Sequence, residues 1–304
     1  PETKLALLGT GDRQRTDIVE LTIETLNGLI AGKGNLGWAP ELRWDLAVTA
    51  KEIDLGRQWA GLDGSVNLKA DSRGGLNDGF SYDLSLDAAL NDYPSALVNL
   101  SGTGTASDAK VRELSVETLG GVMEGHGEAV WSPTATWSFD LVARDINPGT
   151  HYPGLDGRVG LTAETAGGLE DGFEFKLNGD AALDAYPPTR IDLHGIGTAT
   201  SATLESLAVE VIGGRIEGVA ELAWSPALAW NAELSLADLD PGQVLADWPG
   251  SLGGRVQSQG SMADAGLDLT AGVSDFGGRL RGYPVALRAD VAVNGESIQL
   301  RTLE

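Results

Sequence analysis

The sequence predicts an all-β protein built from repeats, and three observations lead to this fold class. The motif Trp-x-Pro-x-x-x-Trp occurs three times with a period of 93 residues, beginning at Trp38, Trp131 and Trp224. Apolar and polar residues alternate along most of the chain, which is the period of a half-buried strand and not of a helix. Glycine is about twice as frequent as usual, at 42 of 304 residues, and recurs at fixed places in the repeat. A fixed period of this length is typical of repeat architectures.

Other motifs keep the same period and set the predicted bounds of the units. The segment Leu7-Leu-Gly-Thr-Gly11 recurs at residues 100–104 and 193–197. We predict one continuous stack of β-repeat units at residues 1–96, 97–189 and 190–286, followed by the start of a truncated fourth unit at 287–304. The third unit slips by four residues, and we expect this insertion in a longer surface loop at 240–249, because repeats accept insertions in loops. The sequence is therefore expected to be a segment of a longer protein.

Each unit contains about six predicted strands with one apolar face. In the first strand Leu21 and Ile23 alternate with Glu20, Thr22 and Glu24. The same alternation follows at 30–38, 42–48, 62–68, 80–86 and 98–102, and in the equivalent segments of the other units. Asn-Asp-Gly at 77–79 is typical of a hairpin turn before the fifth strand. This count gives about 18–20 strands in total.

No amphipathic helix is available to cover the apolar face of these strands, although that face must be covered by something. About twenty strands are too many for an ordinary compact sandwich or barrel. We therefore predict an elongated, U-shaped β-trough, or β-taco, with an apolar interior and an acidic or hydroxylated exterior. Inward glycines such as Gly32, Gly34, Gly125 and Gly127 either allow the sheet to bend sharply or mark β-bulges.

The inward apolar residues form the candidate binding site, because an uncovered apolar face favours an apolar guest such as acyl chains. The alternative is that these residues form the interior of a closed sandwich. The tryptophan pairs either contact lipid at the rim of the trough or staple the Pro turn as cross-strand pairs. The predicted groove-lining residues are Leu21, Ile23, Ile30, Trp38, Trp44, Leu46, Val48, Val66, Leu68, Tyr82, Leu84, Leu86, Val98, Leu100, Leu114, Val116, Met123, Trp131, Trp137, Phe139, Leu141, Val159, Leu161, Phe173, Phe175, Leu177, Ile191, Leu193, Leu207, Val209, Ile216, Leu222, Trp224, Trp230, Leu234, Leu236 and Val256.

Composition and motifs argue against several other classes of function. A formal charge of −23 makes nucleic acid an unsuitable partner, because phosphate binding requires clustered Lys and Arg. The chain has no cysteine, and His126, His151 and His194 occupy unrelated positions in the repeat, so no metal site is predicted. The glycines at 32–37 spell G-x-G-x-x-G, but no helix pattern follows them. We predict a protein that is not an enzyme and uses no cofactor.

At this point the residues support a family resemblance. The repeated unit, together with Leu239-Asp-Pro241, Trp248-Pro-Gly250 and Leu280-Arg-Gly-Tyr-Pro284, resembles the TamB branch of the AsmA-like, bridge-like lipid-transfer superfamily. The resemblance covers the whole chain, although the first two units lack the Leu-Arg-Gly-x-Pro form. It implies a periplasmic segment of an inner-membrane-anchored protein of a Gram-negative bacterium, with the anchor outside the segment. It also implies phospholipid traffic and an outer-membrane Omp85-type (TamA-like) barrel partner that binds regions outside this segment.

The predicted function is therefore a segment of a periplasmic hydrophobic conduit that carries phospholipids between the inner and outer membranes. A first alternative is a scaffold or chaperone for assembly of outer-membrane proteins or autotransporters with the Omp85-type partner, by strand addition at edges or the outer face. A second alternative is a purely structural β-repeat with a closed and dry interior.

Overall fold

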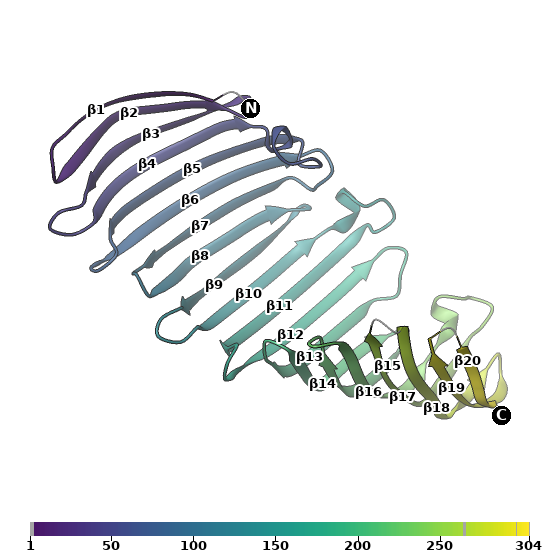
Figure 1. Ribbon diagram of the computed structural model, residues 1–304. Helices are drawn as coiled ribbons and strands as arrows, with labels where there is room; N and C mark the ends of the chain where they lie inside the picture. The colour runs from purple at the N-terminus through teal and green to yellow at the C-terminus, as the bar shows by residue number, and fades with distance from the viewer. Residues whose placement is uncertain (1–2, 264–265, 296, 304) are drawn as a thin grey trace. The chain divides into compact units, whose positions relative to one another are not determined.

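The prediction of an all-β fold is confirmed by a computed structural model, which describes residues 3–263, 266–295 and 297–303 (Figure 1). Those residues form twenty strands and three short 3₁₀ helices. By their contacts they separate into two units, Pro1–Gly154 and Leu155–Glu304. In the described residues there is no helix of the length and apolarity needed to cross a membrane.

The first unit is an antiparallel meander in which each strand pairs with the next one in sequence, and the strands bend along their length (Figure 1). Its elements are β1 (Lys4–Gly11), β2 (Arg15–Thr25), β3 (Gly28–Gly37), β4 (Arg43–Ile53), η1 (Leu55–Arg57), β5 (Gly64–Gly75), β6 (Gly79–Leu90), β7 (Ala96–Gly104), β8 (Asp108–Thr118), β9 (Gly121–Val130), β10 (Thr136–Ile146) and η2 (Pro148–Thr150).

The second unit is also an antiparallel meander of sequential strands. Its elements are β11 (Gly157–Gly168), β12 (Gly172–Leu183), β13 (Thr189–Gly197), β14 (Ser201–Val211), β15 (Gly214–Ala223), β16 (Leu228–Leu239), η3 (Pro241–Gln243), β17 (Gly250–Ala263), β18 (Gly266–Leu280), β19 (Tyr283–Asn294) and β20 (Ser297–Leu303). The strands are longer than the sequence predicted. Their ends consist of polar and small residues, in which the alternation of apolar and polar side chains is too weak to be recognised.

Bulges lie opposite the inward glycines. The register of β2 against β3 shifts between Ile18 and Leu21, whose partners are Gly34 and Gly32, and β8 and β14 shift at the equivalent places. Gly34 has φ of +144°, and a Cβ there would lie 2.0 Å from the Asp45 carbonyl oxygen, so this position requires glycine. A bulge also bends a strand and increases its twist. Both roles predicted for the inward glycines, allowing the sheet to bend and marking β-bulges, therefore apply at the same position.

The 3₁₀ turns after β4, β10 and β16 share one cap. Asp54, Asn147 and Asp240 each accept a hydrogen bond from the backbone N–H two residues later, at 2.9–3.1 Å. The connection that contains Asp240 runs from 240 to 249, the same length as the 54–63 connection of the first copy. The prediction that the four extra residues lie in this loop is therefore wrong. The extra residues of the third copy instead lengthen β17 and β18 to 14 and 15 residues, against 12 for β5 and β6.

No second layer covers these sheets. Extensive contacts between elements of the described residues join only neighbours in the chain. The buried apolar residues are few and mostly small, namely Ala50, Ile53, Ala143, Leu239 and Ala292. The accessible surface is 18,686 Å² for 31.6 kDa, whereas even two separate compact units of half that mass would expose about 15,000 Å². The two sides of the sheet are thus both open within the described units.

Candidate apolar binding face

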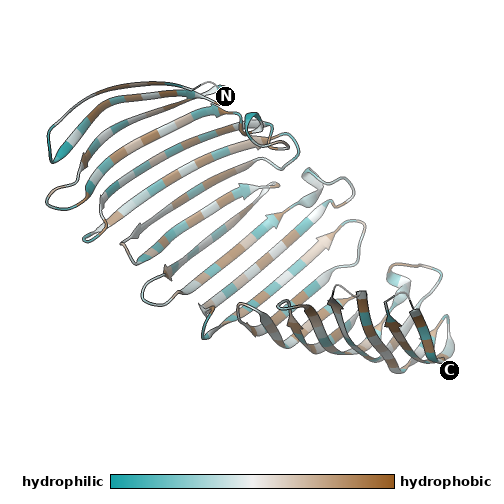
Figure 2. Cartoon of the chain, viewed as in Figure 1, coloured by the Kyte–Doolittle hydropathy of each residue, from teal (hydrophilic) through white to brown (hydrophobic). Residues whose placement is uncertain are grey.

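In the first unit the register of the strands collects the predicted apolar residues on one face. The central rows show this directly, since Leu68 pairs with Leu86, Leu86 with Val98, and Val98 with Val116. Residues that are paired directly across strands project from the same side of a sheet. Hydrophobic and hydrophilic residues accordingly alternate along the strands in Figure 2. The first unit therefore has a continuous apolar face that runs from β1 to β10.

The second unit has an apolar face of the same kind. Leu177 pairs with Leu193, Leu193 with Leu207, and further along the sheet Ile216 pairs with Leu236. The face continues beyond the predicted set, because Leu269 pairs with Val293 in the last strands. The predicted groove-lining set left out Leu36 and Phe80, although they lie on the predicted apolar faces of their strands, and the sequence prediction omitted Leu5, Leu7, Ile18, Val273 and Val291, which the register places on the apolar faces. A period-2 search extended to every strand would have found most of them.

The predicted groove-lining residues are half-buried with five exceptions. Trp38, Trp131, Ile191, Leu222 and Trp224 are 38–50% exposed, and no residue of the set is fully buried. A closed sandwich would bury most of these side chains completely, as core residues of compact domains are. The apolar face is nevertheless the less exposed one, since neighbouring side chains on it shield each other. This arrangement leaves apolar surface available, and lipid contact by these residues remains a prediction.

The two tryptophans of each motif occupy different environments. Trp38, Trp131 and Trp224 follow the ends of β3, β9 and β15. Their Nε1–H groups donate to the carbonyl oxygens of Arg13, Ala106 and Ala199 in the preceding hairpin turn, at 2.8–2.9 Å. These tryptophans tie two consecutive hairpins together at one rim of each unit. The sequence missed this role because the acceptor lies 25 residues earlier in the chain.

The second tryptophan of each motif lies on the apolar face instead. Trp44 pairs with Leu36, Trp137 with Ala129, and Trp230 with Leu222. The predicted cross-strand pairing of the two tryptophans is therefore wrong, although the first one does act as a staple. The Nε1–H groups of Trp44 and Trp230 donate to the hydroxyl oxygens of Ser72 and Ser258, at 2.8 and 3.0 Å.

Aromatic rings on the apolar face lie over glycines of the next strand. Phe80 and Tyr82 of β6 pair with Gly104 and Gly102 of β7. Phe173 and Phe175 of β12 pair with Gly197 and Gly195 of β13. A Cβ built on any of these glycines would lie 2.3–2.8 Å from a ring atom or the Tyr82 hydroxyl. The two glycines of each Gly-x-Gly therefore leave space for two aromatic rings of the preceding strand, and we call each such glycine position a notch.

Tyr82 illustrates the polarity of this face. Its hydroxyl donates to the Lys110 carbonyl oxygen at 3.2 Å, and partial burial raises the pKa of the phenol. A neutral phenol whose only donor is satisfied adds little polarity to the apolar face. The charge of Arg112 acts on the pKa of this phenol in the opposite direction, but more weakly than burial.

The opposite face carries the charged residues, many of them in cross-strand ion pairs. Arg73 contacts Asp45 of the neighbouring strand at 2.8 Å, whereas Lys176 contacts Glu174 of its own strand at 3.0 Å. Hydrogen bonds from Lys176 and then His194 lower the pKa of the exposed Glu174. Such exposed pairs contribute little to stability individually. The described residues include no cluster of three or more His, Cys, Asp or Glu that could hold a metal ion.

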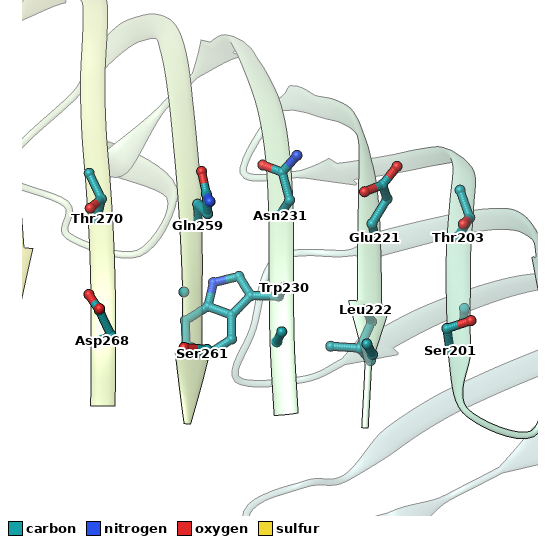
Figure 3. Close-up of a pocket in the computed structure, with 14 residues that line it drawn as sticks. Ser201, Thr203, Glu221, Leu222, Trp230, Asn231, Gln259, Ser261, Asp268 and Thr270 are labelled. Carbon is teal, nitrogen blue, oxygen red and sulfur yellow. The ribbon is translucent and has the colours of Figure 1, made fainter. Parts of the chain in front are cut away.

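Two hollows lie on the polar face of the second unit. The larger, about 890 Å³, crosses one end of β14–β18, where Thr203, Glu221, Asn231, Gln259 and Thr270 form a row (Figure 3). Its lining contains carboxylates but no Lys or Arg, so it offers no charge for an anion. The smaller hollow, about 770 Å³, contains Arg190 and Arg215, and both arginines are paired with Glu210. Neither hollow resembles a site for an apolar chain.

Comparison with known proteins identifies the family of this chain. The family model described as "TamB, N-terminal domain" matches residues 1–80, 75–173 and 165–303, which together span almost the whole chain. The chain belongs to the TamB family. The translocation and assembly module subunit TamB of Haemophilus influenzae is 23% identical over 123 residues, which are 40% of this chain and 10% of that protein. The chain thus spans a small part of the length of its TamB relative. No solved structure matches the chain.

The three family matches to this TamB chain overlap one another and begin at residues 1, 75 and 165. The bounds of the predicted units themselves remain a prediction. The family recognised from the residues is confirmed. In the motif Leu239-Asp-Pro241, Leu239 is buried and Asp240 caps η3.

Proposed function

We propose that this TamB segment carries phospholipids by laying their acyl chains along its apolar faces, as part of a hydrophobic conduit between inner and outer membranes. One observation carries the proposal: each unit has a continuous apolar face with no layer of protein against it. The lipid head group would remain at the rim, in contact with water. The proposed location is the periplasm, within a protein anchored in the inner membrane.

The energetics of such a face favour transport over tight recognition. Removing a methylene group from water contributes ~0.8 kcal/mol, and this contribution has no preferred direction. Successive positions along the face therefore offer a lipid similar free energies, and a chain can move between them without a chemical step. Selectivity for chain length or unsaturation should be low for the same reason.

A charge on the apolar face tests the conduit proposal. Leu141→Asp places a carboxylate among half-buried apolar residues of β10, whereas Ser138→Asp adds the same charge to the other face of the same strand. We expect native mass spectrometry of protein purified from cells to detect bound phospholipid in the wild type and Ser138→Asp. Leu141→Asp should have clearly less. Val116→Lys is a second variant that should lose lipid in the same way.

Photoreactive acyl chains give an independent readout. A phospholipid with a diazirine in its acyl chain should label apolar-face residues and spare the charged face. Circular dichroism would check that each variant retains its strands. Equal lipid occupancy in Leu141→Asp and Ser138→Asp, or labelling of both faces alike, would contradict the conduit. Absence of lipid from the wild type would support the purely structural alternative.

A second candidate function is assembly of outer-membrane proteins or autotransporters with an Omp85-type barrel. It is favoured by the relative, which is named a subunit of a translocation and assembly module. In this case variants of strand edges and of the charged face should impair autotransporter secretion, and Leu141→Asp should not. Secretion assays on the same three variants would distinguish the two candidates.

A further inference from the structure

The larger hollow on the polar face of the second unit is crossed by a row of five polar side chains. Each member of the row is paired directly with the next one, strand by strand from β14 to β18 (Figure 3). The row consists of Thr203, Glu221, Asn231, Gln259 and Thr270. Neighbouring strands lie about 4.8 Å apart, so the row is about 19 Å long. Its side chains all project from the same side of the sheet.

The side chains of this row are not used for contacts within the protein. None of the five makes a side-chain hydrogen bond or an ion pair with a residue that the structure describes. In the first copy of the repeat the same place carries an ion pair. There Asp45, the equivalent of Asn231, contacts Arg73, which lies opposite it as Gln259 lies opposite Asn231. The third copy thus replaces a pair of charges that satisfy each other by two amides with unused donors and acceptors.

The extra residues of the third copy lie at this same end of the sheet. In the first copy β5 ends at Gly75 and β6 begins at Gly79, and these two glycines are paired. By their register against the preceding strand, the equivalents in the third copy are Ser261 and Asp268, which are also paired. A hydroxyl and a carboxylate of the hollow therefore stand where the first copy has glycines. The hollow, the loss of the ion pair and the lengthened strands occur together in one copy.

The lining of the hollow excludes several classes of ligand. It contains no Lys or Arg, so a phosphate, sulfate or carboxylate group would meet only like charge. The two carboxylates, Glu221 and Asp268, belong to strands about 14 Å apart, so they cannot hold one metal ion together. The core of a protein–protein interface is apolar, whereas only the small Ala223 and Ala229 separate the polar groups on this face.

We propose that this hollow binds an extended, neutral glycan chain that lies across β14–β18. Sugar hydroxyl groups both donate and accept hydrogen bonds, which matches a lining of hydroxyls and amides that do the same and of carboxylates that accept. A row of about 19 Å can contact several sugar residues in succession, so the ligand is a chain and not a single sugar.

The occupant is a glycan chain and not the sugar head group of a glycolipid. The apolar face proposed to hold acyl chains is the opposite face of the sheet, so a glycolipid bound in the hollow would leave its hydrocarbon in water. The glycan site thus goes beyond the proposed conduit and does not depend on it.

Saturation-transfer difference NMR on the whole chain tests the proposal, because this method detects weak ligands. The neutral probes are the tetrasaccharides of glucose and of N-acetylglucosamine, each with its disaccharide. The anionic probe is a chondroitin sulfate tetrasaccharide. We expect a neutral tetrasaccharide to bind with a Kd on the order of 1 mM. Its disaccharide, which reaches only part of the row, should bind roughly tenfold more weakly, and the sulfated probe should not bind.

Substitutions of exposed amides locate the site without disturbing the fold. Asn231→Ala combined with Gln259→Ala should weaken binding of the tetrasaccharide by roughly tenfold, the scale of two hydrogen bonds. Asn178→Ala is the matched control, because it removes an exposed amide of β12 outside the hollow and should leave binding unchanged. Circular dichroism would check that the variants retain their strands.

Three results would overturn the glycan site and leave the conduit untouched. The first is binding that the double variant does not weaken. The second is equal affinity for the sulfated and neutral probes, or for the disaccharide and tetrasaccharide. The third is no binding of either neutral tetrasaccharide at about 10 mM, a concentration that fills a site of millimolar affinity.

Discussion

The effect of Gly197→Ala on the free energy of unfolding should be destabilising or stabilising depending on the residue at position 173. The three atoms nearest to a Cβ built on Gly197 all belong to the Phe173 ring, at 2.3–2.9 Å. The backbone of Gly197 is not left-handed, so alanine can adopt its conformation. The ring is therefore the nearest obstacle to alanine at this position.

The expected magnitudes follow from the two contributions. In the wild type, Gly197→Ala must displace the ring and should destabilise the second unit by about 1–3 kcal/mol, as overpacking does. Phe173→Ala alone should cost about 2 kcal/mol, less than truncation of a fully buried phenylalanine because this ring is half-buried. In the Phe173→Ala background, Gly197→Ala should stabilise by about 0.4–1 kcal/mol through the reduced freedom of the unfolded chain.

Denaturant unfolding of the four proteins of this double-mutant cycle measures the sign directly. Amide hydrogen exchange in β12 and β13 would localise the effect if the units unfold in separate steps. Gly195→Ala is the matched control, because a Cβ there lies 2.3 Å from the Thr203 carbonyl oxygen. It should destabilise in either background. If Gly197→Ala destabilises equally with and without the ring, glycine is required there for a backbone reason and the notch interpretation is refuted.

Three further predictions concern the rim, the cap and the charged face. Trp224→Phe removes the 2.9 Å hydrogen bond to the preceding hairpin and should lower the free energy of unfolding by about 1 kcal/mol in a denaturant titration. Asp240→Ala removes the acceptor of two backbone N–H groups and should cost about 1–2 kcal/mol, whereas Asp240→Asn should be mild because Asn147 forms the equivalent cap. The pKa of Glu174 is lowered, so its ionised form stabilises the fold above its ordinary pKa of 4.5, and this contribution is lost as the pH falls through the lowered value. NMR titration should place its midpoint below 4.5, and Glu174→Gln should remove this part of the pH dependence of unfolding.

The sequence allowed us to predict which face of a strand each residue lies on, but not the register between paired strands. Alternation is a local signal, so residues such as Leu84 and Leu86 could be assigned to the apolar face without knowing their neighbours. The bulge opposite Gly34 and the notch at Gly197 depend on a partner strand, and a local period contains no information on it. The same limit misplaced the extra residues of the third copy, because an insertion that lengthens both β17 and β18 preserves their alternation.

One feature of the sheet could have been found from the repeat itself. An aromatic pair in one strand and Gly-x-Gly in the next occur together in two copies. In the third copy leucines replace both rings: Leu269 is paired with Val293, whereas the carbonyl oxygen of Leu267 accepts from the N–H of Gly295, which is still glycine. A correlated change between copies thus indicates the contact at one of the two positions. The hydrogen bond of Trp38 to the earlier hairpin had no such signal, since its acceptor is a backbone carbonyl that any residue supplies.

Stability and the proposed lipid binding are separable in this architecture for a physical reason. A compact domain is stabilised by a core, so a charge placed there unfolds the protein and conceals any effect on binding. Here each strand contacts its neighbours in sequence, as in other repeat proteins, and the buried apolar residues of the described part are few and mostly small. Water can reach the half-buried position of Leu141, so an aspartate there retains part of its hydration while it removes an apolar place for a hydrocarbon chain. An apolar face that the fold does not need to bury is therefore a surface on which guests can bind and leave without unfolding the sheet.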